Sequence, residues 1–246
     1  MLLKSEVLKR INPKILEGVA HRGLHSDVLT ENGMKAFKAA VDAQCAIELD
    51  VHLAKDGKLI VCHDSELYRT TGKKGIIEDL TSQEIRDNYK LLDGGVVPTF
   101  QEVLTLVNEE VPLVVEMKTY RKNNKELAQA LKNELVNDED KRNFVIIAFD
   151  PRALMAFGKE AGYMRMLLVI KDGKHDWIYL FRNKFEGVDL DHRFLKKASV
   201  RHYAKKHFTN VWTIDNPELL QSVARYADTV TFQFLDPLVV RNTLKK

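Results

Sequence analysis

The sequence predicts a single-domain parallel (β/α)8 barrel of 246 residues. The main observation is that short apolar runs alternate with amphipathic segments from Thr99 onwards, as in parallel β/α proteins. A second observation is that polar residues follow several of the apolar runs, where the ends of barrel strands share one rim. A doubly wound open sheet is the alternative fold. The sequence lacks the Gly-x-Gly-x-x-Gly fingerprint, which disfavours the dinucleotide-binding version of that sheet.

The N-terminal third is expected to supply the first strands of the barrel. Its expected elements are a short amphipathic helix at 2–11, a buried strand at 15–20, a helix that starts after an N-cap at Asn32, a strand at 46–53, and a short apolar run at 59–62 after an Asp-Gly turn. Residues 65–98 interrupt this rhythm with glycine-containing turns and one capping-box helix that starts at Thr81. We expect residues 65–98 to be an insertion within the domain, because the segment is too short for a core of its own.

The remaining chain repeats one unit, a helix followed by a strand. The expected pairs are helix 99–110 and strand 111–118, helix 125–137 and strand 144–150, helix 151–161 and strand 165–170, helix 176–184 and strand 187–191, helix 198–207 and strand 210–214, and helix 217–226 and strand 228–234, before a final helix. With the strands at 15–20 and 46–53, this makes eight barrel strands.

Composition indicates a globular protein without a strong charge bias. Hydrophobic residues make up 45% of the chain and charged residues 30%, and the formal net charge is +3. This charge could attract a small anion but is too weak to indicate a nucleic-acid partner. The two cysteines, Cys45 and Cys62, are expected to be free thiols. No signal-peptide or membrane-spanning pattern is found, so we expect a cytoplasmic protein without stable membrane insertion.

The strand at 46–53 carries the first candidate site. Strict alternation places Glu48, Asp50 and His52 on one face of this strand. Two desolvated carboxylates on one face repel each other, so a cation between them is one explanation. A wet edge strand is the other explanation, and the stretch alone does not decide between them. His52 could reach the site or be a satisfied barrel-lining residue.

Further polar residues follow other predicted strands. Convergence of Glu48, Asp50 and Glu116 at one rim would provide carboxylate oxygens for a hard cation, Mg²⁺ or Ca²⁺, with Mn²⁺ also possible. Arg22 and Lys118 would supply positive charge for a phosphate. His21 and His63 could serve as base and acid near neutral pH. This combination of residue types suits the cleavage of a phosphodiester.

The ordered motifs resemble those of the glycerophosphodiester phosphodiesterase family. The matching pieces are His21-Arg22-Gly23, Glu31-Asn32, Glu48-Leu49-Asp50-Val51, Lys55-Asp56-Gly57, His63-Asp64, Leu67-x-Arg69-Thr70-Thr71, Val97-Pro98-Thr99-Phe100, Glu116-x-Lys118 and Val211-Trp212-Thr213. The resemblance implies a (β/α)8 barrel with a small insertion after the second strand. It also implies hydrolysis of glycerophosphodiesters to glycerol 3-phosphate and an alcohol, through a cyclic phosphate.

The resemblance also assigns roles to individual residues. It implies that His21 and His63 are the catalytic acid and base, and that Glu48, Asp50 and Glu116 are metal ligands. The positions implied to bind phosphate or substrate are Arg22, Lys118, Glu31, Asn32 and Trp212. From the residues alone, Trp212 could stack on substrate or belong to the core. The small-molecule substrate is the expected partner, and the oligomeric state is not predicted.

Two alternative functions use the same barrel. One is a lysophospholipase D-like activity, which would need a wider apolar mouth. The other is a non-catalytic phosphodiester-binding protein, although mere binding needs no pair of histidines. Outside the motifs, Asp189, Asp191 and His192 form another cluster at a strand end, for which ion pairs or a supporting role are expected. His25 is expected to be solvated.

Overall fold

Eight parallel strands form a closed barrel in the computed structural model, which describes residues 4–136 and 140–245. Strand β1 pairs with both β2 and β9, so the sheet closes on itself. The barrel strands are β1 (Val19–His21), β2 (Ala46–Leu53), β4 (Leu113–Met117), β5 (Phe144–Ala148), β6 (Met164–Val169), β7 (Gly187–Asp191), β8 (Phe208–Ile214) and β9 (Thr229–Phe232). The predicted (β/α)8 barrel is confirmed.

The register of the first strands brings the predicted polar residues together. His21 lies opposite Glu48 across the β1–β2 pair, and Asp50 lies opposite Glu116 across the β2–β4 pair. A ninth strand, β3 (Leu59–Val61), pairs antiparallel with the end of β2 and extends the sheet beside the barrel. Because β3 turns back along β2, His63 returns towards the carboxyl end of the barrel.

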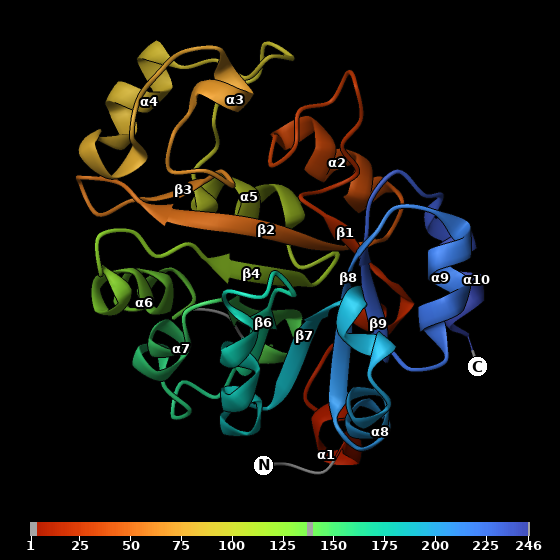
Figure 1. Ribbon diagram of the computed structural model, residues 1–246. Coiled ribbons are helices and arrows are strands. Elements are labelled where there is room, and N and C mark those ends of the chain that lie inside the picture. Colours follow the sequence, from red (N-terminus) through yellow and green to blue (C-terminus); the bar gives the residue numbers. More distant parts are fainter. Residues whose placement is uncertain (1–3, 137–139, 246) are drawn as a thin grey trace.

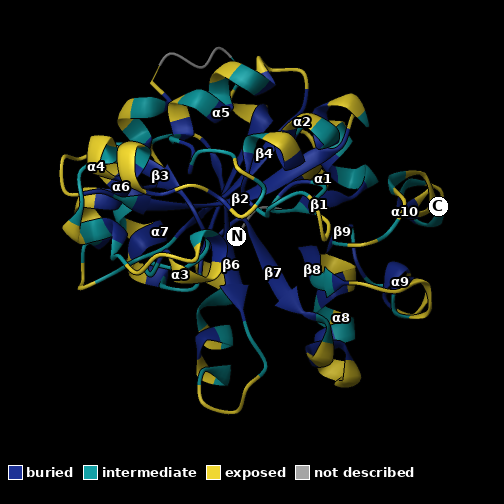
Figure 2. Ribbon diagram, turned by 90° about the horizontal axis from the view of Figure 1, so that it is seen from above, coloured by how far each residue is buried: buried dark blue, intermediate teal, exposed yellow. Residues whose placement is uncertain are grey.

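A ring of helices covers the barrel, and Figure 2 shows the buried strands inside this partly exposed ring. The helices of the repeats are α2 (Met34–Asp42), α5 (Phe100–Val107), α6 (Asn124–Glu134), α7 (Pro151–Phe157), α8 (Ala198–Lys206), α9 (Pro217–Ala224) and α10 (Pro237–Leu244). Most are shorter than predicted, because caps end them early. The N-terminus of α5, for example, is fixed by a capping box between Thr99 and Glu102, and Asn108 ends this helix in the left-handed region.

Three local predictions differ from the structure. The strand predicted at 15–20 is a 3-10 helix, η1 (Pro13–Glu17), followed by the shorter β1, because Asn12 caps a helical turn that starts with proline. Asn32 is not the N-cap of α2; Gly33 takes that position, and the Asn32 side chain bonds to Asp50 instead. The segment predicted as helix 176–184 is a 3-10 helix, η4 (Asp176–Lys184).

The N-terminal segment packs against the end of the barrel opposite the predicted site. The amphipathic helix predicted at 2–11 is α1 (Lys4–Leu8) in the described part; residues 2 and 3 lie outside it, as does the predicted end of α6 at 137. Val7, Ile11 and Ile15 pack with residues at the starts of the strands, such as Phe208. This apolar cluster closes one end of the barrel, so polar side chains gather at the other end.

The predicted insertion, residues 65–98, contains α3 (Tyr68–Thr71), η2 (Ile77–Asp79) and α4 (Ser82–Asn88) and lies above the β2–β3 hairpin in Figure 1. The predicted capping box at Thr81 is present at the start of α4. Leu67, Ile77 and Ile85 form a small hydrophobic cluster with Ala54 and Ile60 of the hairpin. The buried residues of the insertion therefore share a core with the barrel strands rather than forming one alone.

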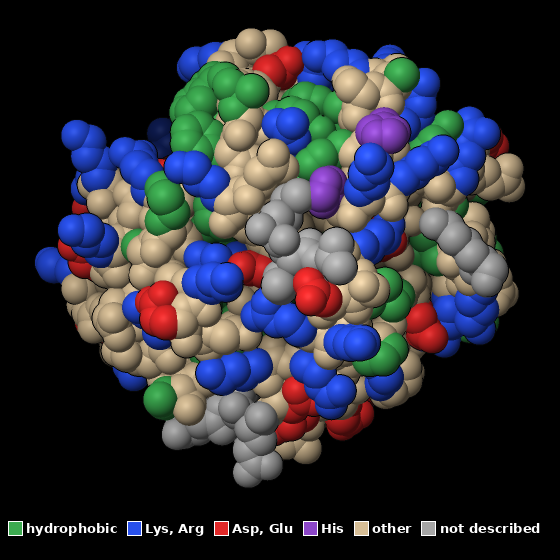
Figure 3. All heavy atoms as spheres, turned by 90° about the horizontal axis from the view of Figure 1, so that it is seen from below, with side chains coloured by type: hydrophobic (Ala, Val, Ile, Leu, Met, Phe, Trp, Pro, Cys, Tyr) green, Lys and Arg blue, Asp and Glu red, His purple; other side chains and the backbone are tan. Residues whose placement is uncertain are grey.

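The surface mixes charges of both signs, and Figure 3 shows Lys and Arg side chains spread among acidic ones over the face on which α1 lies. Cys45 and Cys62 are buried free thiols, as predicted, and burial raises the pKa of each to about 11. Among the helices of the described part, none combines the length and the apolar character needed to cross a membrane.

Candidate active site

A cavity of about 320 Å³ lies at the carboxyl end of the barrel, where the predicted residues meet. Its lining combines charged side chains from β1, β2 and β4 with apolar side chains from β5, β6 and β8. The lining residues are His21, Arg22, Glu48, His63, Glu116, Lys118, Ile147, Phe149, Leu168, Ile170, Asp189, Trp212 and Thr231. Seven of the ten residues predicted for the site are among them.

Three carboxylates form a compact acidic cluster beneath the charged side. Glu48, Asp50 and Glu116 each present an oxygen, and these oxygens lie within 4.8 Å of one another. All three residues are buried, and Asp50 is 0% exposed. The cluster arises because alternation points Glu48 and Asp50 to one face of β2, while the register with β4 places Glu116 beside Asp50.

Two cations of the chain partly neutralise this cluster. The Nζ atom of Lys118 lies 3.0 Å from Glu116 Oε1 and 3.6 Å from Asp50 Oδ1. The Nε atom of Arg22 lies 3.3 Å from Asp50 Oδ2. Burial opposes ionisation of Asp50, but Lys118 and Arg22 hold the pKa of this carboxyl below its usual range.

The other two carboxyls remain poorly compensated. Burial, followed by the charge of Asp50, raises the pKa of Glu48 well above its usual value. Burial also raises the pKa of Glu116 to about 8, against the opposing effect of Lys118. Burial thus favours the neutral forms of Glu48 and Glu116 in the metal-free protein, and a divalent cation would stabilise the ionised forms of all three carboxyls.

The acidic cluster fits a hard cation in its donor atoms as well as its charge. Asp50 Oδ1 is buried and has no hydrogen-bond partner, since Lys118 approaches it only at ion-pair distance. Asp50 Oδ2 is held in place by Asn32, whose Nδ2 donates to it at 2.8 Å. A buried carboxylate oxygen without a donor is a suitable ligand for Mg²⁺ or Ca²⁺.

Both predicted catalytic histidines border the cavity and are oriented by a partner. Nδ1 of His21 donates to Gln233 Oε1 at 2.9 Å, and Nδ1 of His63 donates to Asp64 Oδ1 at 2.8 Å. The Nε2 atom of each ring is then the free nitrogen; in His21 it lies 4.0 Å from Glu48 Oε2. Burial lowers the pKa of His21 to about 4 and lowers the pKa of His63. The ring of His21 is thus neutral at pH 7 and able to accept a proton.

The turn after β1 holds Arg22 in an unusual backbone conformation. Arg22 has φ of 55°, in the left-handed region, and its backbone N–H donates to Glu48 Oε2 at 3.0 Å. Gly23 follows with φ of 79°, and a Cβ atom there would lie 2.8 Å from the carbonyl carbon of Ala36. The His-Arg-Gly sequence therefore fits a turn in which only glycine can occupy the third position.

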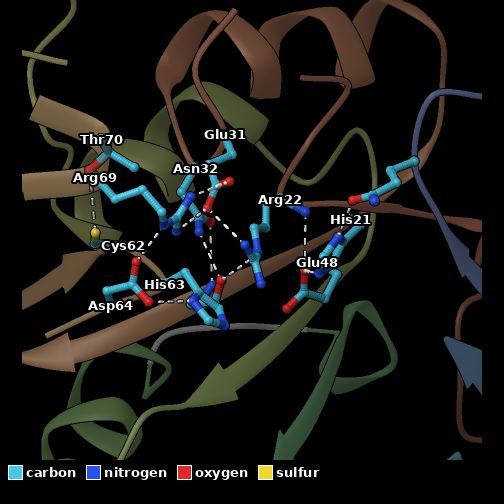
Figure 4. A network of polar contacts seen from close by, with 12 residues as sticks. His21, Arg22, Glu31, Asn32, Glu48, Cys62, His63, Asp64, Arg69 and Thr70 are labelled. Atoms are coloured by element: carbon cyan, nitrogen blue, oxygen red, sulfur yellow. Dashed lines mark hydrogen bonds and ion pairs between the residues drawn. The ribbon is translucent and has the colours of Figure 1, made fainter. Parts of the chain in front are cut away.

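A network of ion pairs surrounds the charged side, as Figure 4 shows. Glu31 accepts a hydrogen bond from Nη1 of Arg22 and two from Arg69, all at 2.8 Å. Arg69 also donates from Nε to Asp64 Oδ2 at 2.6 Å. Partial burial opposes ionisation of Glu31, but the two arginines lower its pKa to about 2. Glu31 and Asn32, predicted as substrate-binding positions, thus contact site residues rather than the cavity itself.

The opposite side of the cavity is apolar and aromatic. The rings of Phe149 and Trp212 meet edge to face, with centroids 5.7 Å apart. Nε1 of Trp212 donates to the backbone carbonyl of Asp189 at 3.2 Å. Trp212 therefore borders the cavity and has a satisfied N–H, and its stacking on the substrate stays a prediction.

Asp189 is a cavity residue that sequence reasoning missed. It lies on β7 and borders the cavity, whereas a supporting role was expected. No ion pair of Asp189 occurs in the described part of the chain, and its Oδ1 accepts from Asn210 Nδ2 at 2.8 Å. Burial raises the pKa of Asp189 to about 7. Alternation along β7 could have indicated this position, because it places Asp189 on the same face of the strand as Gly187 and Asp191.

The remaining histidines and aspartates lie outside the cavity lining. Nδ1 of His52 lies 2.7 Å from Glu78, so this histidine contacts the insertion rather than the acidic cluster. His25, expected to be solvated, is partly buried with its ring 4.9 Å from that of Phe234. Asp191 pairs with Arg193, which agrees with the ion-pair prediction.

Comparison with known proteins identifies a matching family and individual relatives. Residues 21–242 match the model of the glycerophosphoryl diester phosphodiesterase family. A glycerophosphodiester phosphodiesterase from Caldanaerobacter subterraneus subsp. tengcongensis is 34% identical over 171 residues, covering 63% of this chain and 67% of the relative. One from Bacillus altitudinis is 29% identical over 165 residues, with the same two coverages.

Solved structures show the same fold. A glycerophosphodiester phosphodiesterase from Thermotoga maritima superposes with a TM-score of 0.71 at 25% identity, covering 87% of this chain and 93% of that one. An Oleispira antarctica phosphodiesterase, solved in complex with the product sn-glycerol-3-phosphate, gives a TM-score of 0.77 at 22% identity, covering 93% and 96%.

Proposed function

Because the chain belongs to the glycerophosphoryl diester phosphodiesterase family, we propose that it hydrolyses glycerophosphodiesters with a divalent cation and two histidines. The products are glycerol 3-phosphate and an alcohol. The observation that carries this proposal is the acidic cluster of Glu48, Asp50 and Glu116 beside two oriented imidazoles in one cavity. The Oleispira antarctica protein of the same fold holds such a product, which is consistent with a substrate of this size.

Glu48, Asp50 and Glu116 are the residues that would hold the cation. Their oxygen-only donor set favours Mg²⁺ or Ca²⁺, and Mn²⁺ accepts similar ligands. When bound, the cation supplies positive charge that stabilises the phosphoryl oxygens. Lys118 and Arg22 border the same part of the cavity and would bind the remaining phosphate oxygens.

His21 and His63 would transfer the protons. One neutral ring removes the proton from the attacking hydroxyl of the glycerol as its oxygen bonds to phosphorus. The bond from phosphorus to the alcohol oxygen breaks, and that oxygen takes a proton from the other ring, which enters the step protonated on Nε2 as well as on Nδ1. Water then opens the resulting cyclic phosphate, with the two rings in reversed roles. Gln233 and Asp64 support this exchange because each fixes Nδ1 of one ring and leaves Nε2 for the substrate.

The test measures release of glycerol 3-phosphate from glycerophosphocholine. We expect activity with Mg²⁺, Ca²⁺ or Mn²⁺, loss on chelation, and a decrease of about 10²–10⁴-fold in His21→Ala and His63→Ala. His202→Ala is the matched control, because His202 is exposed on α8 outside the cavity. Full activity in chelator would refute the cation requirement, and full activity of both histidine variants would refute the proton-transfer roles.

A second candidate is lysophospholipase D-like activity, favoured by an apolar groove beside the cavity. This groove includes Met155, Trp177 and Phe181, and it shares Phe149 with the cavity. Trp177 is 54% exposed, so the groove could hold an acyl chain. Comparing turnover of glycerophosphocholine and lysophosphatidylcholine decides between the two substrates. A preference for glycerophosphocholine that Trp177→Ser leaves unchanged would exclude a role for the groove.

A further inference from the structure

Asp189 has no role in the proposed phosphodiester hydrolysis, although it borders the same cavity. We propose that Asp189, with Trp212 and Phe149, binds an ammonium group on the alcohol that leaves the phosphodiester. The inference rests on the proposed function and narrows its substrate class to phosphodiesters of amino alcohols, such as glycerophosphoethanolamine and glycerophosphocholine.

The carboxyl of Asp189 is built into the cavity wall with one oxygen available. The residue is 1% exposed, so its position is fixed by packing. Oδ1 accepts from Asn210 Nδ2, which also donates to Thr231 Oγ1 at 2.7 Å. Oδ2 accepts no hydrogen bond from any residue that the structure describes. An oriented carboxyl with a free oxygen at a cavity wall is a binding group for a donor.

The lack of an ion pair at Asp189 in the described part of the chain also favours a cationic ligand there. The carboxylates on the opposite side have Arg22 and Lys118 beside them. Asp189, in contrast, forms no ion pair within residues 4–136 and 140–245, and only burial and Asn210 affect its ionisation. A buried carboxylate without a cation is costly, and a ligand that brings the cation removes this cost.

Asp189 lies on the side of the barrel towards which the alcohol part of a bound phosphodiester would extend. In the closed order of the strands, β7 lies four strands from β2, which is directly across a ring of eight. A phosphate bound beside Glu48 and Glu116 would therefore extend one substituent across the cavity towards Asp189. The cavity of about 320 Å³ limits that substituent to a small group.

The aromatic residues favour an ammonium group over a hydroxyl group. A primary ammonium group and a hydroxyl group could both donate to Asp189. Only a cation, including the quaternary ammonium of choline, is also attracted by the carboxylate charge and by the π faces of nearby rings. Trp212 and Phe149 border the cavity and meet edge to face, and Trp212 is anchored through its N–H to the backbone of Asp189 itself. The carboxyl and the two rings thus form one connected wall.

The test compares two substrates that differ at a single group. Glycerophosphoethanolamine carries an ammonium where glycerophospho-ethylene glycol carries a hydroxyl. We expect kcat/KM of the wild type to be about tenfold higher for the ammonium substrate. Asp189→Asn should reduce this preference, because it should lower kcat/KM for the ammonium substrate more than kcat/KM for the hydroxyl substrate. Asp215→Asn, which removes one exposed charge after β8, should keep the preference.

A binding measurement separates this inference from the proposed hydrolysis. Titration with choline alone, followed by tryptophan fluorescence, should show saturable binding to the wild type that Asp189→Asn weakens about tenfold. If the wild type releases no glycerol 3-phosphate but binds choline in this way, the proposed function fails and the ammonium site stands. Equal kcat/KM for the two substrates, or choline binding that Asp189→Asn does not weaken, would overturn the ammonium site.

Discussion

The two sides of the cavity are built on different principles. On the charged side, formed by β1, β2 and β4, side chains are held by ion pairs that extend outward through Glu31 and Arg69. On the apolar side, formed by β5 to β8, the wall consists of aliphatic and aromatic side chains, and Asp189 has a single side-chain hydrogen bond. The first side keeps several charges close together, whereas the second keeps one carboxyl isolated.

This difference suggests that the charged side carries the phosphate chemistry and that the apolar side recognises the alcohol. Phosphate chemistry requires a fixed array of charges, and each charge in such an array must be positioned by another group. Recognition of the alcohol requires a complementary shape and one charged contact, which can change without disturbing the reacting groups. Substitutions on the charged side should therefore affect every substrate, and those on the apolar side should affect only some.

The largest effect is expected for Glu48→Gln on the charged side. This change removes a proposed metal ligand but keeps the shape of the side chain, including an oxygen that can accept from the Arg22 N–H. We expect affinity for Mg²⁺, measured by calorimetry, and kcat/KM to fall together by more than about a thousandfold. Glu126→Gln, on the surface of α6, is the control.

The same variant tests the electrostatic account without any activity measurement. Burial and Asp50 raise the pKa of Glu48, so its ionised form destabilises the metal-free protein. Glu48→Gln should therefore raise the melting temperature in chelator, by about 2–4 °C for each kcal/mol gained. The substitution should also abolish the rise in melting temperature that Mg²⁺ causes in the wild type. A lower melting temperature in chelator would contradict the account.

An intermediate effect is expected for Arg69→Met, although Arg69 does not border the cavity. Arg69 binds Asp64, which orients His63, and Glu31, which binds Arg22. Loss of the guanidinium should lower kcat by about 10–100-fold with a smaller change in KM. Arg142→Met breaks a similar exposed ion pair, with Asp140 before β5, and should leave kcat unchanged.

A double-mutant cycle shows whether Arg69 acts through these carboxyl groups. In a background that carries Asp64→Asn and Glu31→Gln, the further change Arg69→Met should lower kcat by less than about threefold. An unchanged decrease in that background would mean that Arg69 acts by another route, such as the fold of the insertion. Nitrogen chemical shifts of His63 would also report whether Nδ1 keeps its proton in Arg69→Met.

The sequence predicted the barrel and the charged side more completely than the apolar side. Alternation in β2 placed Glu48 and Asp50 on one face, and the rule that strand ends share a rim brought Glu116 to them. Both inferences need only the period of a strand and the geometry of a parallel barrel. The roles of the ten predicted residues stay proposals, although seven of them border one cavity.

The apolar side was harder to predict because it depends on packing between distant segments. Phe149 follows β5 and Trp212 lies on β8, and nothing in their local sequences shows that their rings meet. Asp189 and Asp191 were both assigned to ion pairs or a supporting role because they lie outside the family motifs, and only Asp191 forms an ion pair in the described part of the chain. The difference between these two aspartates lies in their partners, because Arg193 lies beside Asp191 whereas the neutral amide of Asn210 lies beside Asp189.

The smallest effect on turnover of a neutral substrate is expected for Asp189→Asn, but its effect on stability should depend on pH. Burial raises the pKa of Asp189 from 3.8 to about 7 in the folded protein. A raised pKa means that protonation favours the folded state, so this contribution is fully present below pH 3.8 and is lost as the pH rises through about 7. Asparagine resembles the protonated acid at every pH.

Asp189→Asn should therefore become more stable relative to the wild type between pH 4 and pH 7. The shift of the pKa corresponds to at most about 4 kcal/mol in the difference between their free energies of unfolding. Denaturant unfolding of both proteins at several pH values measures this difference, with Asp215→Asn as the exposed control. A difference that stays constant from pH 4 to pH 7 would show that a cation of the protein already compensates Asp189. The contrast between the two sides of the cavity would then be one of shape rather than of charge.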